Sequence, residues 1–308
     1  MVVKGLSATD SVNLDIAQFE SGDVLHIHWI NILFNNQTED SIVDALNDFK
    51  KKLLQLKCKG VKVIWTVHNR QNHEQFNLEI EYKFRNELSN LCDAVILHHP
   101  IIEMELKGWL DDKARIEIIE HGLYQATYKN DIGKLEAQKK IGLKTNALTI
   151  ATLGKFKEYK ELAAKLRIFK QALTESELSA TYVVAGKIFC KNTLAQVKGF
   201  NNDSLVVVNK FINDDDVQLY LNSADYVLLS YRDILTSGGF FQAMSFLKQV
   251  LAPSLGSLKY YVTDGLNGYT YDNEDQLRAI LKRLSINHED ARFAENLVSW
   301  PFDSKTNS

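Results

Sequence analysis

Histidines gather at the ends of the predicted β-strands in the first part of the chain. Seven of the eight histidines lie in the first 121 residues, at positions His26, His28, His68, His73, His98, His99 and His121. In an open parallel sheet, a ligand binds beyond the carboxyl ends of the strands. Imidazoles there can hold a metal ion, contact a sugar or a phosphate, or act as a base. We therefore expect a polar site at this edge of the predicted sheet.

A metal centre is one chemistry that these histidines allow. His26 and His28 stand two residues apart on one face of a strand, so both can reach one metal ion. A metal-dependent hydrolase also needs a carboxylate ligand after a later strand. The later predicted strands are followed instead by Gly186, Asn209, Ser230 and Pro253. Recognition of a sugar or a phosphate is the interpretation that we prefer.

Two segments of the second half can bind an anion. Gly154 to Lys160 follows a predicted strand and begins a helix; its glycine allows close backbone approach, and its lysines lie near a helix N-terminus. The alternative interpretation of this segment is a solvated basic face. Thr236-Ser237-Gly238-Gly239 follows another strand, and Ser237 can cap the helix after it. The N–H groups of these small residues are then available to a phosphate oxygen.

The strands that position these segments are short β-branched runs. They are Val24–His28, Val61–Thr66, Ala94–Leu97, Ile116–Ile119, Leu148–Thr152, Thr181–Ala185, Ser204–Val208, Tyr226–Leu229 and Gln249–Ala252. Amphipathic stretches lie between them, such as Ser41–Lys57, whose apolar residues recur at helical spacing. Nearly continuous apolar strands are typical of parallel sheets buried on both faces. The alternation predicts an α/β fold of doubly wound parallel sheets.

Length and composition indicate two domains of an ordinary folded protein. The chain has 308 residues, 45% of them apolar and 24% charged, with a net charge of −3. These values exclude a disordered chain, a collagen-like repeat and a coiled coil, and nothing in the charge points to nucleic acid. Three scattered cysteines predict neither disulfides nor zinc. No secretory signal or membrane span is evident, which predicts a cytoplasmic protein.

The stretch from Phe211 to Tyr271 resembles the C-terminal donor domain of GT-B glycosyltransferases of the large group 1, or family 4-like, set. The matching segments are Ala224-Asp225, Leu235-Thr236-Ser237-Gly238, Gln242-Ala243-Met244-Ser245, Ala252-Pro253 and Asp264-Gly265-Leu266-Asn267-Gly268. Gly154 to Lys160 resembles the family's Gly-x-x-Arg-x-x-Lys phosphate loop, with Lys157 in the arginine place. The segments His26–Trp29, Thr66–Asn69 and His121-Gly122 resemble a subgroup that builds bacterial surface polysaccharides.

The resemblance implies two Rossmann-like domains facing a cleft, here residues 1–128 and 129–290, with 291–308 returning toward the first. It implies transfer of a sugar from a UDP- or GDP-sugar to a saccharide or lipid-linked acceptor, without a metal or cofactor. The implied donor-binding residues are Gly154, Lys157, Lys160, Gly186, Phe211, Thr236, Ser237, Gly238 and Gln242. The implied catalytic residues are His68, first in importance, with His28 and His121 beside it.

This sequence departs from the family pattern at three places. Two glutamates eight positions apart are replaced by Ile234 and Gln242, so an inverting reaction with Glu74 or His73 as base stays open. About 22 residues precede Asp23 without a clear strand, so we expect the N-terminal domain to lack its first βα unit. The chain also ends soon after Trp300, where the family's last helix normally crosses back.

Three further hypotheses follow from these features. The departures favour a non-catalytic or partner-dependent GT-B subunit. A nucleotide-sugar 2-epimerase on the same fold is a weaker alternative, because no convincing pair of carboxylates is evident. A basic, apolar surface around Phe34 and the Lys50-Lys51-Lys52 run is a candidate for contact with a lipid-linked acceptor at the inner face of a membrane.

Overall fold

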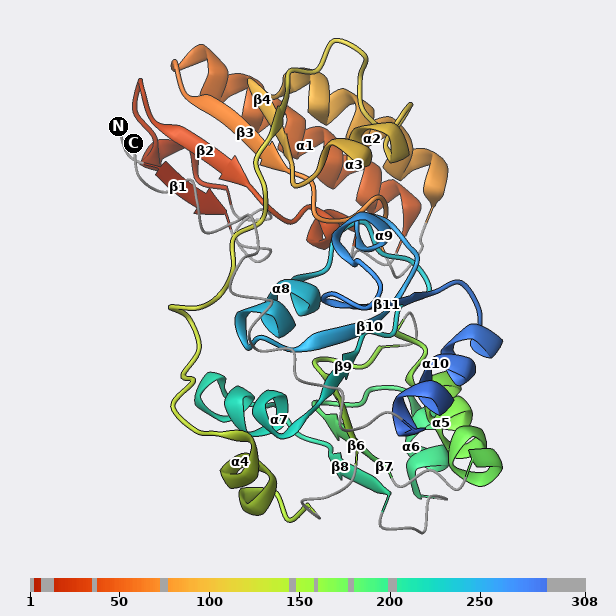
Figure 1. Cartoon of the computed structure of the whole chain (residues 1–308). Helices are drawn as coiled ribbons and strands as arrows, with labels where there is room; N and C mark the ends of the chain where they lie inside the picture. The colour runs from red at the N-terminus through yellow and green to blue at the C-terminus, as the bar shows by residue number, and fades with distance from the viewer. Residues whose placement is uncertain are drawn as a thin grey trace. The chain divides into compact units, whose positions relative to one another are not determined.

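The computed structural model (Figure 1) divides into two compact units. It describes residues 3–6, 14–34, 38–72, 77–143, 148–157, 160–176, 180–198 and 204–286. One unit comprises Met1–His121 with Ile234–Thr236, and the other comprises Gly122–Asp233 with Ser237–Ser308. The division thus follows His121, where the sequence suggested residue 128. The segment 291–308, expected to return to the first domain, lies outside the described residues.

The first unit contains a parallel sheet whose strands lie side by side in chain order. Its strands are β1 (Val3–Leu6), β2 (Val24–Ile27), β3 (Lys62–Thr66), β4 (Ala94–Leu97) and β5 (Ile116–Ile118), in the order β1-β2-β3-β4-β5. The connecting helices are α1 (Glu39–Cys58), α2 (Leu78–Leu91) and α3 (Pro100–Glu105). Short 3-10 turns occupy Ile16–Gln18 and Asn31–Phe34. Each strand therefore brings its carboxyl end next to that of its neighbour in sequence.

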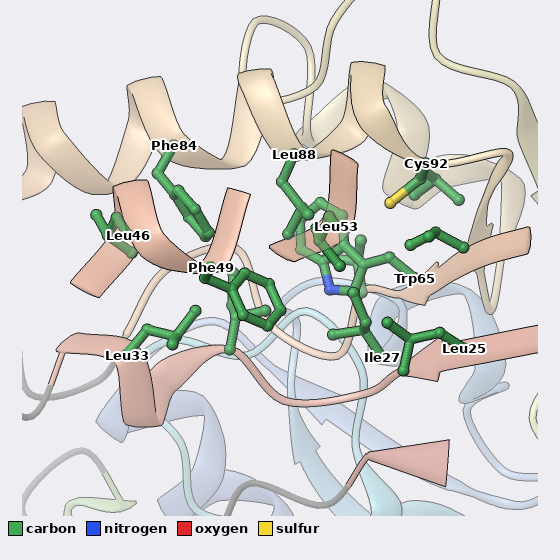
Figure 2. Packing of buried hydrophobic residues seen from close by; sticks show 14 of the residues in the cluster. Leu25, Ile27, Leu33, Leu46, Phe49, Leu53, Trp65, Phe84, Leu88 and Cys92 are labelled. Carbon is green, nitrogen blue, oxygen red and sulfur yellow. The ribbon is translucent and has the colours of Figure 1, made fainter. Parts of the chain in front are cut away.

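Helix α1 forms where its apolar residues predicted it. Thr38 and Ser41 cap its N-terminus reciprocally, which satisfies backbone donors that the first turn leaves unpaired. The predicted face is buried, with Ile42, Leu46, Phe49, Leu53 and Leu56 all less than 5% exposed. Figure 2 shows side chains of α1 and α2 meeting Leu25, Ile27 and Trp65 of the sheet.

Burial alternates along the strands of this first sheet. In β2 and β4 every second residue is buried and the others are half-buried. The consecutive strand order explains this, because right-handed connections that all step in one direction place their helices on one face. The expectation of strands buried on both faces therefore describes the second sheet better than the first.

A strand precedes Asp23, where none was expected from the sequence. Strand β1 pairs in parallel with β2, so that Val3 lies beside Val24 and Leu6 beside Ile27. The expectation that the first unit lacks a strand before Asp23 is therefore wrong. Four residues that include a lysine and a glycine are too short to show a hydrophobic period.

The second unit contains a parallel sheet in which the chain reverses direction across the sheet. Its strands are β6 (Leu148–Leu153), β7 (Ala180–Ala185), β8 (Leu205–Val208), β9 (Tyr226–Leu228), β10 (Gln249–Pro253) and β11 (Gly268–Tyr271). The order is β11-β10-β9-β6-β7-β8. From β6 the chain builds outward to β8, and it then returns to place β9 on the other side of β6. The carboxyl ends of β6 and β9 thus form the switch point of a doubly wound sheet.

Helices alternate with these strands, as the sequence predicted. They are α4 (Lys134–Lys140), α5 (Leu162–Ser176), α6 (Lys191–Lys198), α7 (Val217–Ser223), α8 (Gly238–Ser245), α9 (Leu258–Tyr261) and α10 (Glu274–Ile286), with a 3-10 turn at Asp214–Asp216. Every residue of β7 and β10 is buried, so these strands are covered on both faces. None of the helices in the described part of the chain is long and apolar enough to cross a membrane.

Helix α8 ends in a left-handed residue that is not glycine. Leu247 has φ +54°, and its N–H bonds to the carbonyl of Met244 at 2.9 Å. The N–H of Lys248 bonds to the carbonyl of Ala243 at 3.0 Å. This pair of bonds is the Schellman arrangement, in which glycine is preferred because a Cβ is strained at positive φ.

We therefore expect Leu247→Gly to raise the free energy of unfolding by about 1 kcal/mol. The Leu247 side chain is 45% exposed, so its loss removes little buried area. Urea unfolding measures the change. Leu266→Gly is the control, since Leu266 is also exposed but has no positive φ; an equal gain in both variants would contradict the explanation.

Candidate functional site

Five histidines of the first unit form a continuous row along the carboxyl edge of its sheet. The row follows the strand order: His26 and His28 come from β2, His68 from β3, His98 from β4 and His121 from β5. Successive ring centroids lie 4.1, 5.4, 5.5 and 5.1 Å apart. The predicted His28, His68 and His121 thus belong to one cluster.

His68 lies in the middle of the row and is held by its neighbours. Its Nε2 lies 3.1 Å from Nδ1 of His28, so one imidazole donates a hydrogen bond to the other. The Trp29 ring also stacks on His68, with 4.5 Å between the ring centroids and 18° between the planes. Trp29 is itself 42% exposed. The His68 ring is therefore fixed by two contacts and lies beside an accessible aromatic face.

Burial and the neighbouring rings keep His68 neutral. Burial lowers the pKa of His68 to about 3, and His98, His28, His121 and His26 add to the effect in that order. Burial also lowers the pKa of His26 and of His28. A charged imidazole is unfavourable there because it loses water and faces other rings that can become cationic.

His98 is a member of the row that was expected at a strand end but was not among the implied catalytic residues. Its Nδ1 lies 2.9 Å from the carbonyl oxygen of Ile119, which can only accept, so Nδ1 carries the proton. The signal was present, because His98 follows its strand as His28 and His68 follow theirs. The two candidate bases, His73 and Glu74, lie outside the described residues.

The metal-centre interpretation is not supported by the contacts of its two histidines. The Nε2 atom of His26 lies 2.8 Å from Oγ1 of Thr66, and His28 contacts His68. Within the described residues, no three His, Cys, Asp or Glu side chains are placed to hold one metal ion.

In the second unit, two glycines at adjacent strand ends touch through their backbones. Gly154 follows β6 with φ +130°, and Gly186 follows β7 with φ +143°. A Cβ on Gly186 would lie 1.8 Å from the carbonyl oxygen of Gly154. No other residue can replace Gly186 without moving this backbone. Because both positions are glycines, no side chain of theirs covers the carboxyl end of β6, and a ligand can approach the backbone closely there.

Lys160 places its ammonium group over this glycine pair. Its Nζ lies 2.8 Å from the position that a Cβ on Gly154 would take. It also lies 5.7 Å from the ring centre of Phe156 and 5.5 Å from that of Tyr231. Among the described residues, Lys160 has no carboxylate partner. An ammonium group near two aromatic rings, without a carboxylate partner in the described part of the chain, is suited to bind an anion.

A pocket of about 190 Å³ lies against the same glycines. Gly154, Gly186, Phe211 and Gln242, all predicted as donor-binding, contribute to its lining. The Phe211 side chain is 64% exposed. Burial raises the pKa of Tyr128, another lining residue, and its hydrogen bond with Gln242 opposes this shift. Lys157 is exposed on the loop that follows β6.

Ser237 caps helix α8, as its position in the sequence predicted. Its Oγ accepts a hydrogen bond from the Phe240 N–H at 3.2 Å and lies 3.1 Å from the Tyr231 hydroxyl. The N–H groups of Gly238 and Gly239 have no partner within the described residues. They remain available at the N-terminus of the helix. Thr236, one residue earlier, is buried and groups with the first unit.

Two residues of the segments that resemble the family, Asp225 and Asn267, stabilise the fold of the second unit. Asp225 accepts a hydrogen bond from the Thr149 N–H at 2.9 Å and forms an ion pair with Lys134. Asn267 is fully buried and bonds the Thr263 N–H and the Tyr261 carbonyl at 2.7 and 2.8 Å. The resemblance at these positions therefore reflects how the fold is held together.

The surface around Phe34 and the lysine run differs from the expectation. Phe34 is 5% exposed and belongs to the core of the first unit. Lys50 pairs with Glu87 and Lys52 pairs with Asp48. The predicted basic, apolar surface is therefore absent in this described region, because its apolar residue is buried and two of its charges are neutralised.

Residues 147–287 match the family described as glycosyl transferases group 1. Apart from Ile234–Thr236, this match lies within the second unit. A search of curated protein sequences gives no match. The family match covers the glycine pair, Lys160, helix α8 and all of the pocket lining except Tyr128.

Solved structures share the fold at low sequence identity. Sucrose-phosphate synthase from Thermosynechococcus elongatus is 14% identical, with a TM-score of 0.69 over 90% of this chain and 67% of that one. HepE of Anabaena, bound to UDP and glucose, is 16% identical, with a TM-score of 0.66 over 89% and 71%. The catalytic domain of starch synthase IV from Arabidopsis thaliana, bound to ADP and acarbose, is 12% identical, with 0.66 over 92% and 70%. The predicted GT-B class, an α/β fold with parallel sheets in two domains, is confirmed.

The depressed pKa of His68 predicts a loss of stability in acid. The unfolded histidine titrates near 6.5 and the folded one near 3, so the unfolded chain binds the proton first as the pH falls below 6.5. The stabilisation that neutral His68 gives to the folded state is therefore complete above pH 6.5 and is lost progressively as the pH falls to about 3. Between pH 7.5 and 5.0, we expect the free energy of unfolding to fall by about 1 to 2 kcal/mol less in His68→Asn than in the wild type. Urea unfolding at both pH values measures it, and an unchanged pH dependence would exclude His68 as the cause.

Proposed function

We propose that this chain transfers a glycosyl group from a nucleoside diphosphate sugar to a saccharide or lipid-linked acceptor, without a metal ion. The observation that carries this proposal is the placement of Lys160. Its ammonium lies over Gly154 at the switch point of the second sheet, where a backbone without side chains meets a cation that has no carboxylate partner among the described residues. A diphosphate fits this chemistry, because it needs close approach and positive charge.

The nucleoside part of the donor is assigned to the pocket beside the glycines. Phe211 offers an exposed ring against which a base can stack. The Gln242 amide can both donate to and accept from ribose hydroxyls. The solved complexes of HepE with UDP and of starch synthase IV with ADP support a nucleotide ligand for this fold. Lys155 and Lys187 at the pocket rim add positive charge.

Transition-state stabilisation is assigned to the groups that face the leaving diphosphate. Negative charge grows on its oxygens as the glycosidic bond breaks. Lys160 and Lys157 supply cations, and the N–H groups of Gly238 and Gly239 supply donors at a helix N-terminus. Loss of one such donor typically slows an enzyme by about 100- to 1000-fold. These groups together do the work that a divalent cation does in metal-dependent transferases.

His68 is assigned to the reacting sugar, with His28 and His121 supporting it. A neutral imidazole has one donor and one acceptor nitrogen, so it can bond a hydroxyl or receive a proton. The hydrogen bond between His28 and His68 and the stack on Trp29 hold the His68 ring in one orientation. We propose the surface-polysaccharide pathways of bacteria, in the cytoplasm, as the setting, on the resemblance of the three histidine segments.

A partner-dependent subunit is the second candidate, and Ile234 favours it. Ile234 stands where the family pattern has a carboxylate, and an aliphatic side chain cannot recognise a hydroxyl. A chain of this kind would bind no donor, whereas a transferase would. A thermal-shift panel of UDP-, GDP- and dTDP-sugars separates the two, since a ligand that binds the folded state raises Tm.

We expect Lys160→Met to abolish the donor-induced rise in Tm, because the variant keeps the aliphatic stem between the rings and loses only the charge. Isothermal titration with the donor from the panel that gives the largest shift measures the loss, expected at about 100-fold in Kd from one charge-assisted contact. Lys139→Met is the control, as an exposed lysine of α4. Equal affinity in Lys160→Met and wild type would reject the diphosphate site.

We expect His68→Ala to lose sugar transfer and donor hydrolysis while keeping donor affinity. The His68 ring belongs to the first unit, and the groups assigned to the donor belong to the second. Turnover measured by nucleoside diphosphate release checks this, with a fall of about 100-fold or more expected for a group acting on the reacting centre. Full turnover in a folded variant would remove His68 from the reaction.

A further inference from the structure

We infer that Arg85 and Glu81 of helix α2 are positioning residues for His68, acting through the backbone of the turn that follows it. This inference rests on the proposed role of His68. Neither residue touches the histidine row in the described contacts. Both act on Asn69 and Asn72, the residues that fix where the chain goes immediately after His68.

The two side chains form an ion pair inside the first unit. Arg85 is 1% exposed and Glu81 is 2% exposed. The Nε and Nη2 atoms of Arg85 lie 2.8 and 2.7 Å from Oε1 of Glu81. The guanidinium carbon also lies 5.8 Å from the ring centre of Trp65. Such a pair is costly to desolvate, and an apolar pair of similar size is often as stable.

The remaining hydrogen bonds of the pair go to the turn after β3. Nη1 of Arg85 donates to the Asn69 carbonyl at 2.9 Å, and Oε1 of Glu81 accepts from the Asn72 N–H at 2.7 Å. Asn69 and Asn72 are nearly buried, at 9% and 7% exposed. The arginine thus donates to one buried backbone group of the turn and the glutamate accepts from another. The polar pair therefore hydrogen-bonds the backbone of the turn, which an apolar pair of the same size cannot do.

The turn fixes His68 from both sides in sequence. Before it, the Val67 N–H bonds to the Ile96 carbonyl of β4 at 3.0 Å. After it, the Asn69 carbonyl is held by Arg85, and the Asn69 side chain donates to the Gln71 carbonyl at 2.8 Å. The held groups belong to the 66–67 and 69–70 peptides, so the backbone of residues 67–69 lies between two fixed points. This restricts the Cα–Cβ direction of His68, and the hydrogen bond with His28 then orients its ring.

The decisive variant removes both partners together, as Glu81→Met/Arg85→Met. No charge is left unpaired, so the fold is retained, but the Asn69 carbonyl and the Asn72 N–H must turn toward water. We expect kcat to fall about tenfold to a hundredfold, as a displacement near 1 Å does, with the KM for the donor changed less than about twofold. The matched control is Glu274→Met/Arg167→Met, another Arg–Glu pair, which lies exposed in the second unit.

A second readout does not depend on activity. With ¹³C-labelled histidine, the Cε1–H resonance of His68, assigned by His68→Asn, reports its ring directly in the free protein. We expect it to shift in the double variant, and its pKa to rise from about 3 toward 6.5 as water reaches the ring. The His121 resonance and the control pair should show no such change.

Two single variants keep the test decisive if the double variant does not fold. Arg85→Lys retains the charge but not the fork that serves Glu81 and Asn69 together, so it should shift the His68 resonance. Glu81→Gln retains an acceptor for the Asn72 N–H, so its His68 resonance should stay near the wild-type position, while the loss of the Arg85 counter-charge lowers the free energy of unfolding. An unmoved His68 resonance in Arg85→Lys or in the double variant would overturn the inference. Absence of sugar transfer in the wild type, with the resonance shifted, would count against the proposed function alone.

Discussion

All strand pairs described in both sheets are parallel, and the site residues owe their meeting to this arrangement. Parallel pairing brings every carboxyl end to the same edge, so residues that follow different strands meet there. In the first unit the strands lie in chain order, so His28, His68, His98 and His121, which follow successive strands, lie next to one another in a row. In the second unit the reversal between β6 and β9 instead leaves a gap in the covering connections, and Gly154 and Lys160 lie at that point.

The same edge is stabilised differently in the two units. At the end of β6, glycine backbones touch and hold the loop without side chains. At the end of β3, a buried ion pair from the neighbouring helix supplies the hydrogen bonds of the turn. The first solution leaves space for a ligand of the size of a phosphate, because a Cβ is excluded. The ion pair after β3 instead fixes the direction of the chain at His68, which suits the role that we propose for its side chain at the reacting sugar.

Much of this arrangement could be predicted from the sequence, because it depends on local pattern. The nine expected strands all exist, and the buried face of α1 agrees at Ile42, Leu46, Phe49, Leu53 and Leu56. The clustering of histidines followed from strand ends alone. Hydrophobic periodicity does not reveal the order of the strands in a sheet. The sequence therefore could not predict that the helices of the first sheet cover only one of its faces. Strands β1 and β11 were missed because four residues each, with glycine or lysine among them, show no clear alternation.

Burial of charge is the feature that sequence conveys least. Glu81 and Arg85 stand four residues apart on a helix, and in most proteins such a pair lies on the surface and contributes a few tenths of a kcal/mol. Here the pair is buried, and it bonds two backbone groups of the turn after β3, the Asn69 carbonyl and the Asn72 N–H. A surface pair can be deleted with little effect, whereas this one couples a helix on the covered face of the sheet to the edge where His68 lies. The orientation of His68 that we infer therefore depends on a residue pair that makes no contact with the histidine row among the described residues.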